Sequence, residues 1–393
     1  MEKHKSISRK KMSKSARRTK RIKTVLLVVF VSALIGLAIP LLSACSGDAN
    51  APEQPTNEKN ASLQLTVEGT LPESRASGSA LPTGEDNIRT LAVGVFNLDG
   101  GVNVIAEPTL TGTTASTINC TAGTCNIVVV ANAPSGTFAG VTTLDAFLNK
   151  TVSLGSTATS GVQTPDNLPM SGRTDGVVLE AGITAKTTVN LTRLVARIST
   201  SKVVTAFDAN GQYIKATFKM DRIFLYDACG TSKVSTGDVS FTMPASPYWL
   251  SGGTVNGDGT WTAGTDYLLD DISPAESSLS APHWFYTFAN NSIMHPTKLV
   301  ISGLFDADGA GTAYSEKRVY YPIVVNKAQT GTTIDGTGGG TSTIARNTNY
   351  TISVTLKGIG ADSPEDDIEP VAVDLSVKVN DWELTFLQEV VVY

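Results

Sequence analysis

Apolar and polar residues alternate in many short stretches of this chain, with the period of two that β-strands produce. Clusters of Gly, Asn, Asp, Ser and Pro separate these stretches. The clearest predicted strands are Leu63–Val67, Leu91–Phe96, Asn126–Ala131, Thr187–Ile198, Ala216–Tyr226, Thr297–Gly303, Arg318–Val325, Thr351–Leu356 and Val371–Val379. We expect one short helix, Leu144–Asn149, and two loop-rich stretches, Thr231–Ser277 and Lys327–Arg346. Short strands between turns predict an all-β protein built from sandwiches.

The first 45 residues follow a different pattern. Eleven Lys and Arg residues precede an apolar segment, Val25–Leu42, which is followed by Ser43, Ala44 and Cys45. A basic N-terminal region, an apolar segment and small residues before the cleavage site are typical of a secretory signal peptide, and a cysteine directly after them indicates a lipoprotein signal. We therefore expect residues 1–44 to be a signal peptide and Cys45 to carry acyl chains that hold the precursor on a membrane. A transmembrane anchor is the alternative, because the apolar run approaches the ~20 residues that a spanning helix needs.

Removal of the signal makes the chain strongly acidic. The full sequence has 31 Lys and Arg against 36 Asp and Glu, and the part after residue 44 has 20 against 35. Because nucleic-acid binding relies on clustered Lys and Arg, we expect no nucleic acid among the partners. The remaining length suffices for two domains of normal size. A boundary near Ser199–Ser201 divides it into two similar units, which we place at 76–199 and 200–385.

Three cysteines follow Cys45. Cys120 and Cys125 flank a turn-like Thr-Ala-Gly-Thr spacer, so a disulfide that closes a short hairpin loop is one interpretation in an oxidising compartment. The alternative is that both are small, buried apolar residues. Cys229 would then be a lone buried thiol.

Motifs for catalysis or metal binding are lacking in the sequence. It has no Gly-x-Ser-x-Gly elbow, P-loop or His-Glu-x-x-His. His283 and His295 are the only histidines after the signal, and they have no zinc-ligand spacing. Asp306-Ala-Asp308-Gly309 resembles the start of a calcium loop but lacks the later ligands, so it predicts a turn. We therefore expect neither an enzyme nor a cofactor, a metal or catalytic residues.

Several local phrases together resemble the fimbrillins, which build the type V pili of Bacteroidales. These phrases are Val128-Val-Val-Ala-Asn-Ala-Pro134, Leu168-Pro-Met-Ser-Gly172, Leu191-Thr-Arg-Leu-Val-Ala-Arg-Ile198, Phe285-Tyr-Thr-Phe-Ala-Asn290, Tyr320-Tyr-Pro-Ile323, Arg346-Asn-Thr-Asn-Tyr350 and Val379-Asn-Asp-Trp382. The resemblance implies two transthyretin-like β-sandwich domains in tandem after a lipoprotein signal and a propeptide. It also implies maturation by proteolysis, polymerisation by strand exchange, and a place in a cell-surface fimbria after an outer-membrane, lipidated precursor.

The propeptide that this mechanism needs would be residues 45–75. Ala61–Glu68 alternates as a strand with one buried face should, and the Pro/Ser/Gly-rich stretch around Arg75 after it is a typical protease target. An Arg-specific protease cutting between Arg75 and Ala76 would release the strand and open a groove. Arg89 is the next candidate for cleavage, but it adjoins a predicted strand.

The strand that refills the groove would lie at the C-terminus, in residues 386–393. Phe386, Leu387, Val390, Val391, Val392 and Tyr393 supply its apolar character. An exposed apolar terminal strand favours association between chains, so the partners would be other fimbrial subunits, joined head to tail. The alternative interpretation is that this segment completes the sheet of its own domain.

Two other functions remain open. A non-polymerising surface adhesin or glycan-binding module would use loop aromatics such as Tyr248-Trp249 and His283-Trp284 to stack on sugars. A tip subunit of the same pilus is the other. The ligand on a host or bacterial surface is not specified by the sequence.

Overall fold

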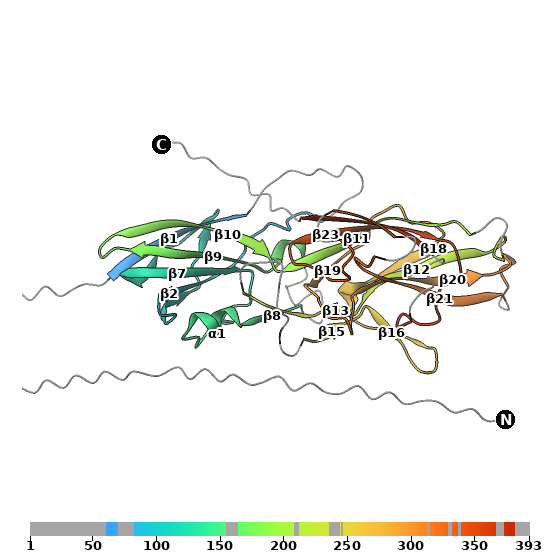
Figure 1. Ribbon diagram of the computed structural model, residues 1–393, viewed down its shortest axis with the longest axis horizontal. Coiled ribbons are helices and arrows are strands. Elements are labelled where there is room, and N and C mark those ends of the chain that lie inside the picture. The colour runs from blue at the N-terminus through green and yellow to red at the C-terminus, as the bar shows by residue number, and fades with distance from the viewer. Residues whose placement is uncertain are drawn as a thin grey trace, which may run out of the picture. The chain divides into compact units, whose positions relative to one another are not determined.

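The structure is a computed structural model (Figure 1), and it describes residues 60–69, 82–154, 164–207, 212–235, 244, 247–312, 315–328, 332–336, 339–366 and 373–381. All of them belong to one compact unit, Pro55–Tyr393. Strands dominate its regular structure, and they form sandwich-like sheets, so the predicted fold class is confirmed. No helix in these residues is both long and apolar enough to span a membrane.

The first sandwich is one nine-stranded sheet that folds over on itself. Its strand order is β3-β2-β7-β9-β10-β1-β5-β4, with β6 also paired to β1. The strands are β1 (Asn60–Gly69), β2 (Leu91–Asn97), β3 (Val102–Ala106), β4 (Leu110–Thr111), β5 (Thr114–Ala115), β6 (Ile118–Thr121), β7 (Gly123–Ala131), β9 (Met170–Leu179) and β10 (Thr184–Arg193). β9 and β10 pair at only two positions, Ser171–Thr192 and Met170–Arg193, so the sheet turns a corner there. An apolar cluster drawn from both layers fills the space between them.

The second sandwich has a seven-stranded sheet, β15-β13-β19-β11-β23-β24-β22, and a four-stranded sheet, β18-β12-β20-β21. The strands of the larger sheet are β11 (Val195–Thr205), β13 (Ala228–Cys229), β15 (Trp249–Leu250), β19 (Trp284–Phe288), β22 (Thr332–Asp335), β23 (Thr348–Leu356) and β24 (Val373–Asp381). Those of the smaller are β12 (Thr217–Tyr226), β18 (Leu269–Glu276), β20 (Lys298–Asp306) and β21 (Glu316–Val324). Buried residues of both sheets form one core cluster.

Short elements complete the fold. They are α1 (Leu144–Leu148), the 3-10 helices η2 (Pro165–Asn167) and η3 (Asp266–Leu268), and the paired strands β8 (Thr151–Ser153) with β14 (Thr231–Lys233) and β16 (Gly253–Val255) with β17 (Trp261–Ala263). The helix is where the sequence predicts it, and the Thr143 hydroxyl caps it by accepting from the Ala146 amide at 3.1 Å.

One local prediction is wrong and another is incomplete. The run predicted as one strand, Thr187–Ile198, is divided at Leu194 between β10 of the first sheet and β11 of the second. Leu194 is fully buried, and its amide donates to the Pro169 carbonyl at 2.8 Å, so the break has its own packing and hydrogen bond. The stretch predicted as loop-rich, Thr231–Ser277, contains four strands of two or three residues and the eight-residue β18 among its described residues. The four short strands have too few residues to show a period, and β18 is mostly exposed, so it lacks the alternation of buried and exposed residues that marks a strand.

Candidate functional site

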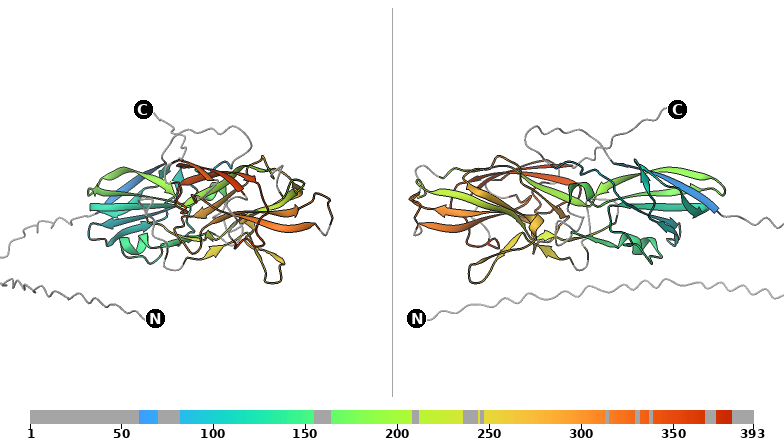
Figure 2. Two further views of the ribbon diagram at one scale, coloured as in Figure 1. Left: turned by 45° about the vertical axis from the view of Figure 1, so that its right-hand side comes forward. Right: turned by 180° about the vertical axis from the view of Figure 1, so that it is seen from behind.

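Strand β1, coloured blue in Figures 1 and 2, is an inner strand of the first sheet and pairs with other strands on both sides. On one side it runs parallel to β10, from the Ser62–Thr184 pair to the Gly69–Leu191 pair. On the other side it runs antiparallel to β6 and β5. Removal of β1 would therefore leave unpaired backbone groups on β10 as well as on β5 and β6.

The apolar face of β1 is completely buried. Leu63, Leu65 and Val67 are each 0% exposed, and Ala61 is 6% exposed. The alternate residues point outward, so the predicted alternation of this strand is confirmed. Burial of a Leu or Val side chain contributes about 1.5–3 kcal/mol, so these side chains hold β1 firmly in the uncut chain.

The groove that β1 fills has walls from both layers of the sandwich. In the same sheet, Val189 and Leu191 of β10 and Ile118 of β6 belong to the same apolar cluster as β1. The opposite layer contributes Leu91 and Val93 of β2, among others. The geometry thus defines an apolar slot, open along its edges to backbone hydrogen bonding.

The residues predicted to release or refill this slot lie outside the described residues. Cys45, Arg75 and Ala76 are in the undescribed stretches on either side of β1. The predicted donor segment, 386–393, follows the end of β24 at Asp381. Their roles stay predictions.

Arg89, the other candidate for cleavage, is held by several contacts. Its guanidinium forms an ion pair with Asp166 and donates to the Asp166 carbonyl at 3.0 Å. Its backbone amide donates to the Asn132 side chain at 2.8 Å. A protease would have to break these contacts before it could bind the chain there.

Both cysteines of the predicted disulfide are free thiols in the structure. Cys120 is 7% exposed and Cys125 is 1% exposed. Cys120 Sγ lies 3.5 Å from the Ile118 carbonyl oxygen, and Cys125 Sγ lies 3.4 Å from that of Val177. Burial raises the pKa of the Cys120 thiol to about 11 and also raises the pKa of Cys125. Their pairing in the oxidised protein stays a prediction.

A buried charged cluster, which no pattern in the sequence indicates, joins the two sandwiches. Glu85 precedes β2, and its carboxylate forms a 2.6 Å ion pair with Arg197 of β11 and accepts a hydrogen bond from the Tyr286 hydroxyl of β19. Arg193 of β10 donates to the Glu85 carbonyl at 3.0 Å. Burial lowers the pKa of Arg193 to about 10 and raises the pKa of Tyr286. The cluster anchors the segment just after the predicted cleavage stretch.

The aromatic residues proposed for sugar stacking are engaged in contacts within the protein. The Trp249 ring stacks on His295 at 4.8 Å, and Trp284 lies 5.4 Å from Tyr286. The Tyr248 side chain is 39% exposed, but its hydroxyl donates to the Leu154 carbonyl. Trp249 and Trp284 are only partly exposed, and each already packs on a neighbouring ring.

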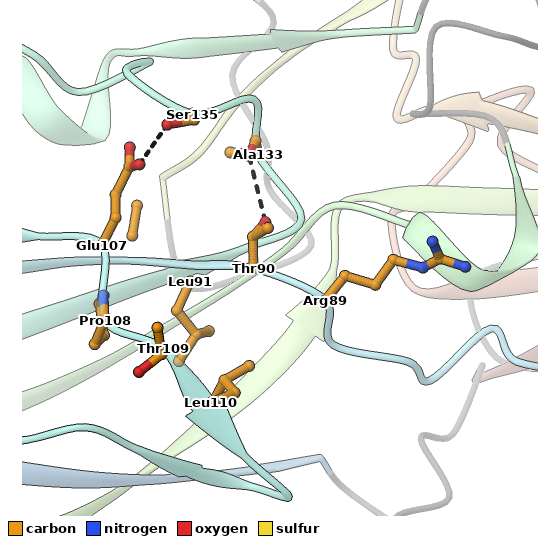
Figure 3. Close-up of a pocket in the computed structure, with 10 residues that line it drawn as sticks. Arg89, Thr90, Leu91, Glu107, Pro108, Thr109, Leu110, Ala133 and Ser135 are labelled. Atoms are coloured by element: carbon orange, nitrogen blue, oxygen red, sulfur yellow. Dashed lines mark hydrogen bonds between the residues drawn. The ribbon is translucent and has the colours of Figure 1, made fainter.

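A small cavity of about 410 Å³ lies beside the start of β2 (Figure 3). Leu91, Pro108 and Leu110 line it together with Glu107, whose carboxylate accepts hydrogen bonds from the Ser135 hydroxyl and the Gly136 amide. The Arg89 guanidinium points away from it in Figure 3. The lining offers no cluster of groups suited to catalysis.

The Asp306–Gly309 stretch forms the turn that the sequence predicts. The Asp306 carboxylate accepts backbone hydrogen bonds from Asp308, Gly309 and Gly311, and the bond from Gly311 is the main cause that lowers the pKa of this carboxyl group. Among the described residues, no group of three His, Cys, Asp or Glu side chains could hold a metal ion.

Comparison with known proteins matches most of the chain to one family. The family model of the major fimbrial subunit protein (FimA) matches residues 61–222, and that of the FimA4 pilin C-terminal domain matches residues 248–382. Major fimbrium subunit FimA type-2 of Porphyromonas gingivalis is 27% identical over 385 residues, which cover 88% of this chain and 94% of that protein. The type-3 subunit is 25% identical over 386 residues, with the same coverage. The crystal structure of a fimbrilin (FimA) from P. gingivalis W83 has a TM-score of 0.62 at 22% identity, covering 83% of this chain and 99% of that one, and so shows the same fold.

Proposed function

The chain belongs to the Bacteroidales fimbrillins, and we propose that this fimbrial subunit is exported as a lipoprotein, cut after Arg75 and polymerised through the groove that β1 fills. The position of β1 carries the proposal. It is a central strand with a buried apolar face, and it is also the first strand in chain order among the described residues. One cut on its C-terminal side would detach it from everything that follows.

The contacts on either side of Arg75 support cleavage at this residue. Upstream, β1 is fixed in the sheet as far as Gly69. Downstream, Glu85 is fixed by the buried charged cluster. A protease acting between these two anchors would leave the segment from Glu85 onward attached to the second sandwich, so that cleavage frees only the propeptide.

Chain length supports a second copy as the source of the replacement strand. β24 ends at Asp381, which pairs with Thr348 and lies near the start of β11. β1 also ends near the point where β10 passes into β11, because Gly69 pairs with Leu191, two residues before β10 ends. A donor strand that runs in the same direction as β1 must begin where β1 begins. The tail would therefore first have to span the length of β1, about 33 Å, from the end of β24 to that point.

That distance exceeds the reach of the subunit's own tail. Only residues 382–385 separate Asp381 from the predicted donor, 386–393. The five Cα–Cα steps from Asp381 to Phe386 reach at most about 18 Å. A donor in the direction of β1 therefore comes from another subunit, and the contact grows head to tail without closing on itself.

Deletion of Val390–Tyr393 tests this proposal. The truncated chain should fold, reach the cell surface and be cut after Arg75, but it should not form filaments. The measurement is electron microscopy of the surface together with gel analysis of heat-labile multimers. Normal filaments from the truncated chain would contradict strand donation. A surface lipoprotein that never polymerises, the alternative function, would instead keep β1 in its groove permanently.

A further inference from the structure

We propose that Cys120 and Cys125 form a thiol pair covered by β1, and that release of β1 opens this pair to exchange with a low-molecular-weight disulfide. The inference rests on the proposed function, because β1 must leave the groove. It assigns a modification site within the groove and names the chemical class of its reactant.

The thiol pair lies directly beside the strand to be released. Ala61 of β1 is the register partner of Cys120 on β6. Cys125 of β7 belongs to the same apolar cluster as Ala61, Leu63 and Cys120. Both thiols therefore face the same core; burial is the main cause of the raised pKa of Cys120, and the negative charge of an ionised Cys125 adds to it. Loss of β1 would remove the side chains that cover Cys120 on one side.

Burial keeps both thiols unreactive while β1 is in place. A thiolate is the reactive form of cysteine, and the raised pKa values leave very little thiolate near neutral pH. Exposure to water would return the pKa of Cys120 toward the usual value of about 8.5. Cys229 provides an internal reference: it is fully buried with a pKa of about 11, but it lies in a different cluster that does not include β1.

The exchange has two steps. The Cys120 thiolate attacks one sulfur of a small disulfide R–S–S–R, so that a Cys120–S–S–R bond forms and one R–S⁻ leaves. The Cys125 thiolate then attacks the Cys120 sulfur, which gives the Cys120–Cys125 disulfide and releases the second R–S⁻. The small disulfide is thereby reduced to two thiols, and the cysteine pair is oxidised.

The first product would compete with strand donation. In the precursor, the residue of β1 that lies beside Cys120 is Ala61, whose side chain is small and buried. A mixed disulfide would place an added group in this part of the groove, where the donor strand has to enter. The open subunit would then have lost its ability to accept a neighbour until a reductant removed the group.

Thiol labelling of three states tests the inference. The states are the full-length precursor, the cleaved Val390–Tyr393 deletion variant and the intact filament, and the probe is a maleimide located by peptide mass spectrometry. We expect Cys120 to be labelled at least tenfold faster in the cleaved variant than in the precursor and to be protected again in the filament, with Cys229 protected throughout. Equal labelling of Cys120 in precursor and cleaved variant, with loss of β1 verified by mass, would overturn the inference while the proposed function stands.

If β1 stays bound after cleavage, the proposed function is wrong. The reactivity of the two thiols is then tested in an uncut variant in which a substitution displaces β1. Leu65→Asp puts a charge at a fully buried position of β1 and should displace the strand. Labelling of Cys120 with Cys229 protected supports the inference. No labelling of Cys120, or equal labelling of Cys229, contradicts it, because the thiols would then react only on unfolding of the whole protein.

The competition has a separate readout. Cleavage in the presence of oxidised glutathione should reduce the filament yield severalfold, and dithiothreitol should restore it. The Cys120→Ala variant, compared with its own yield in the absence of the disulfide, should show no such loss. Equal loss in both proteins would overturn the competition.

Discussion

Leu65→Ala should destabilise the precursor and leave the filament unaffected. Leu65 is 0% exposed and packs in the core of the first sandwich. Truncation of a buried Leu to Ala costs about 2–5 kcal/mol, from the lost transfer free energy and the cavity left behind. Because the proposed maturation removes β1, the cavity would be absent from the filament.

Leu191→Ala is the matched control. Leu191 of β10 is also 0% exposed and lies in the same cluster, and its register partner in β1 is Gly69. It stays in the chain after cleavage, so its truncation should lower the stability of precursor and filament alike, again by about 2–5 kcal/mol.

The assay is guanidinium unfolding of purified precursor and of sheared filaments for wild type and both variants. The free energy of unfolding of the precursor should fall in both variants. The denaturant concentration that dissolves filaments should fall only for Leu191→Ala. A filament that Leu65→Ala weakens as much as Leu191→Ala would refute the reasoning, because β1 would then still fill the groove.

Three further predictions follow from the same account. Cys45→Ser should abolish labelling by radioactive palmitate and reduce surface delivery, and persistent acylation would rule this site out. Arg75→Ala should yield a longer, monomeric precursor that still contains Ala61–Glu68 when its peptides are analysed by mass spectrometry; a filament protein that begins upstream of Ala61 would contradict cleavage there. Glu85→Gln removes the charge that pairs with buried Arg197 and should cost about 3–5 kcal/mol of stability in denaturant unfolding; a change below about 1 kcal/mol would show that this ion pair contributes little to stability.

Local patterns made part of this fold predictable. The spacing of Leu63, Leu65 and Val67 alone predicts a strand with one buried face. The apolar residues of the short helix at Leu144, together with the capping residue Thr143 before it, indicate that helix. These features depend on neighbours in sequence, which a single chain displays directly.

Long-range pairing was not predictable in the same way. The parallel pairing of β1 with β10 joins residues about 120 positions apart, and no periodicity encodes it. The sheet change at Leu194 interrupts a continuous apolar pattern, and that pattern by itself predicts a single strand. Glu85 is a single carboxylate in a loop, and only the fold brings it to Arg197 and Tyr286.

A photo-crosslinking amino acid at Thr188 tests the central claim most directly. Thr188 is exposed on β10, and its register partner in the precursor is Thr66 of β1. In the precursor, the crosslink should therefore join Thr188 to the β1 peptide of the same chain. In the filament, we predict a crosslinked dimer in which position 188 of one subunit is bonded to a residue of 386–393 of another. A filament whose position 188 still crosslinks to β1 would contradict strand exchange in this groove.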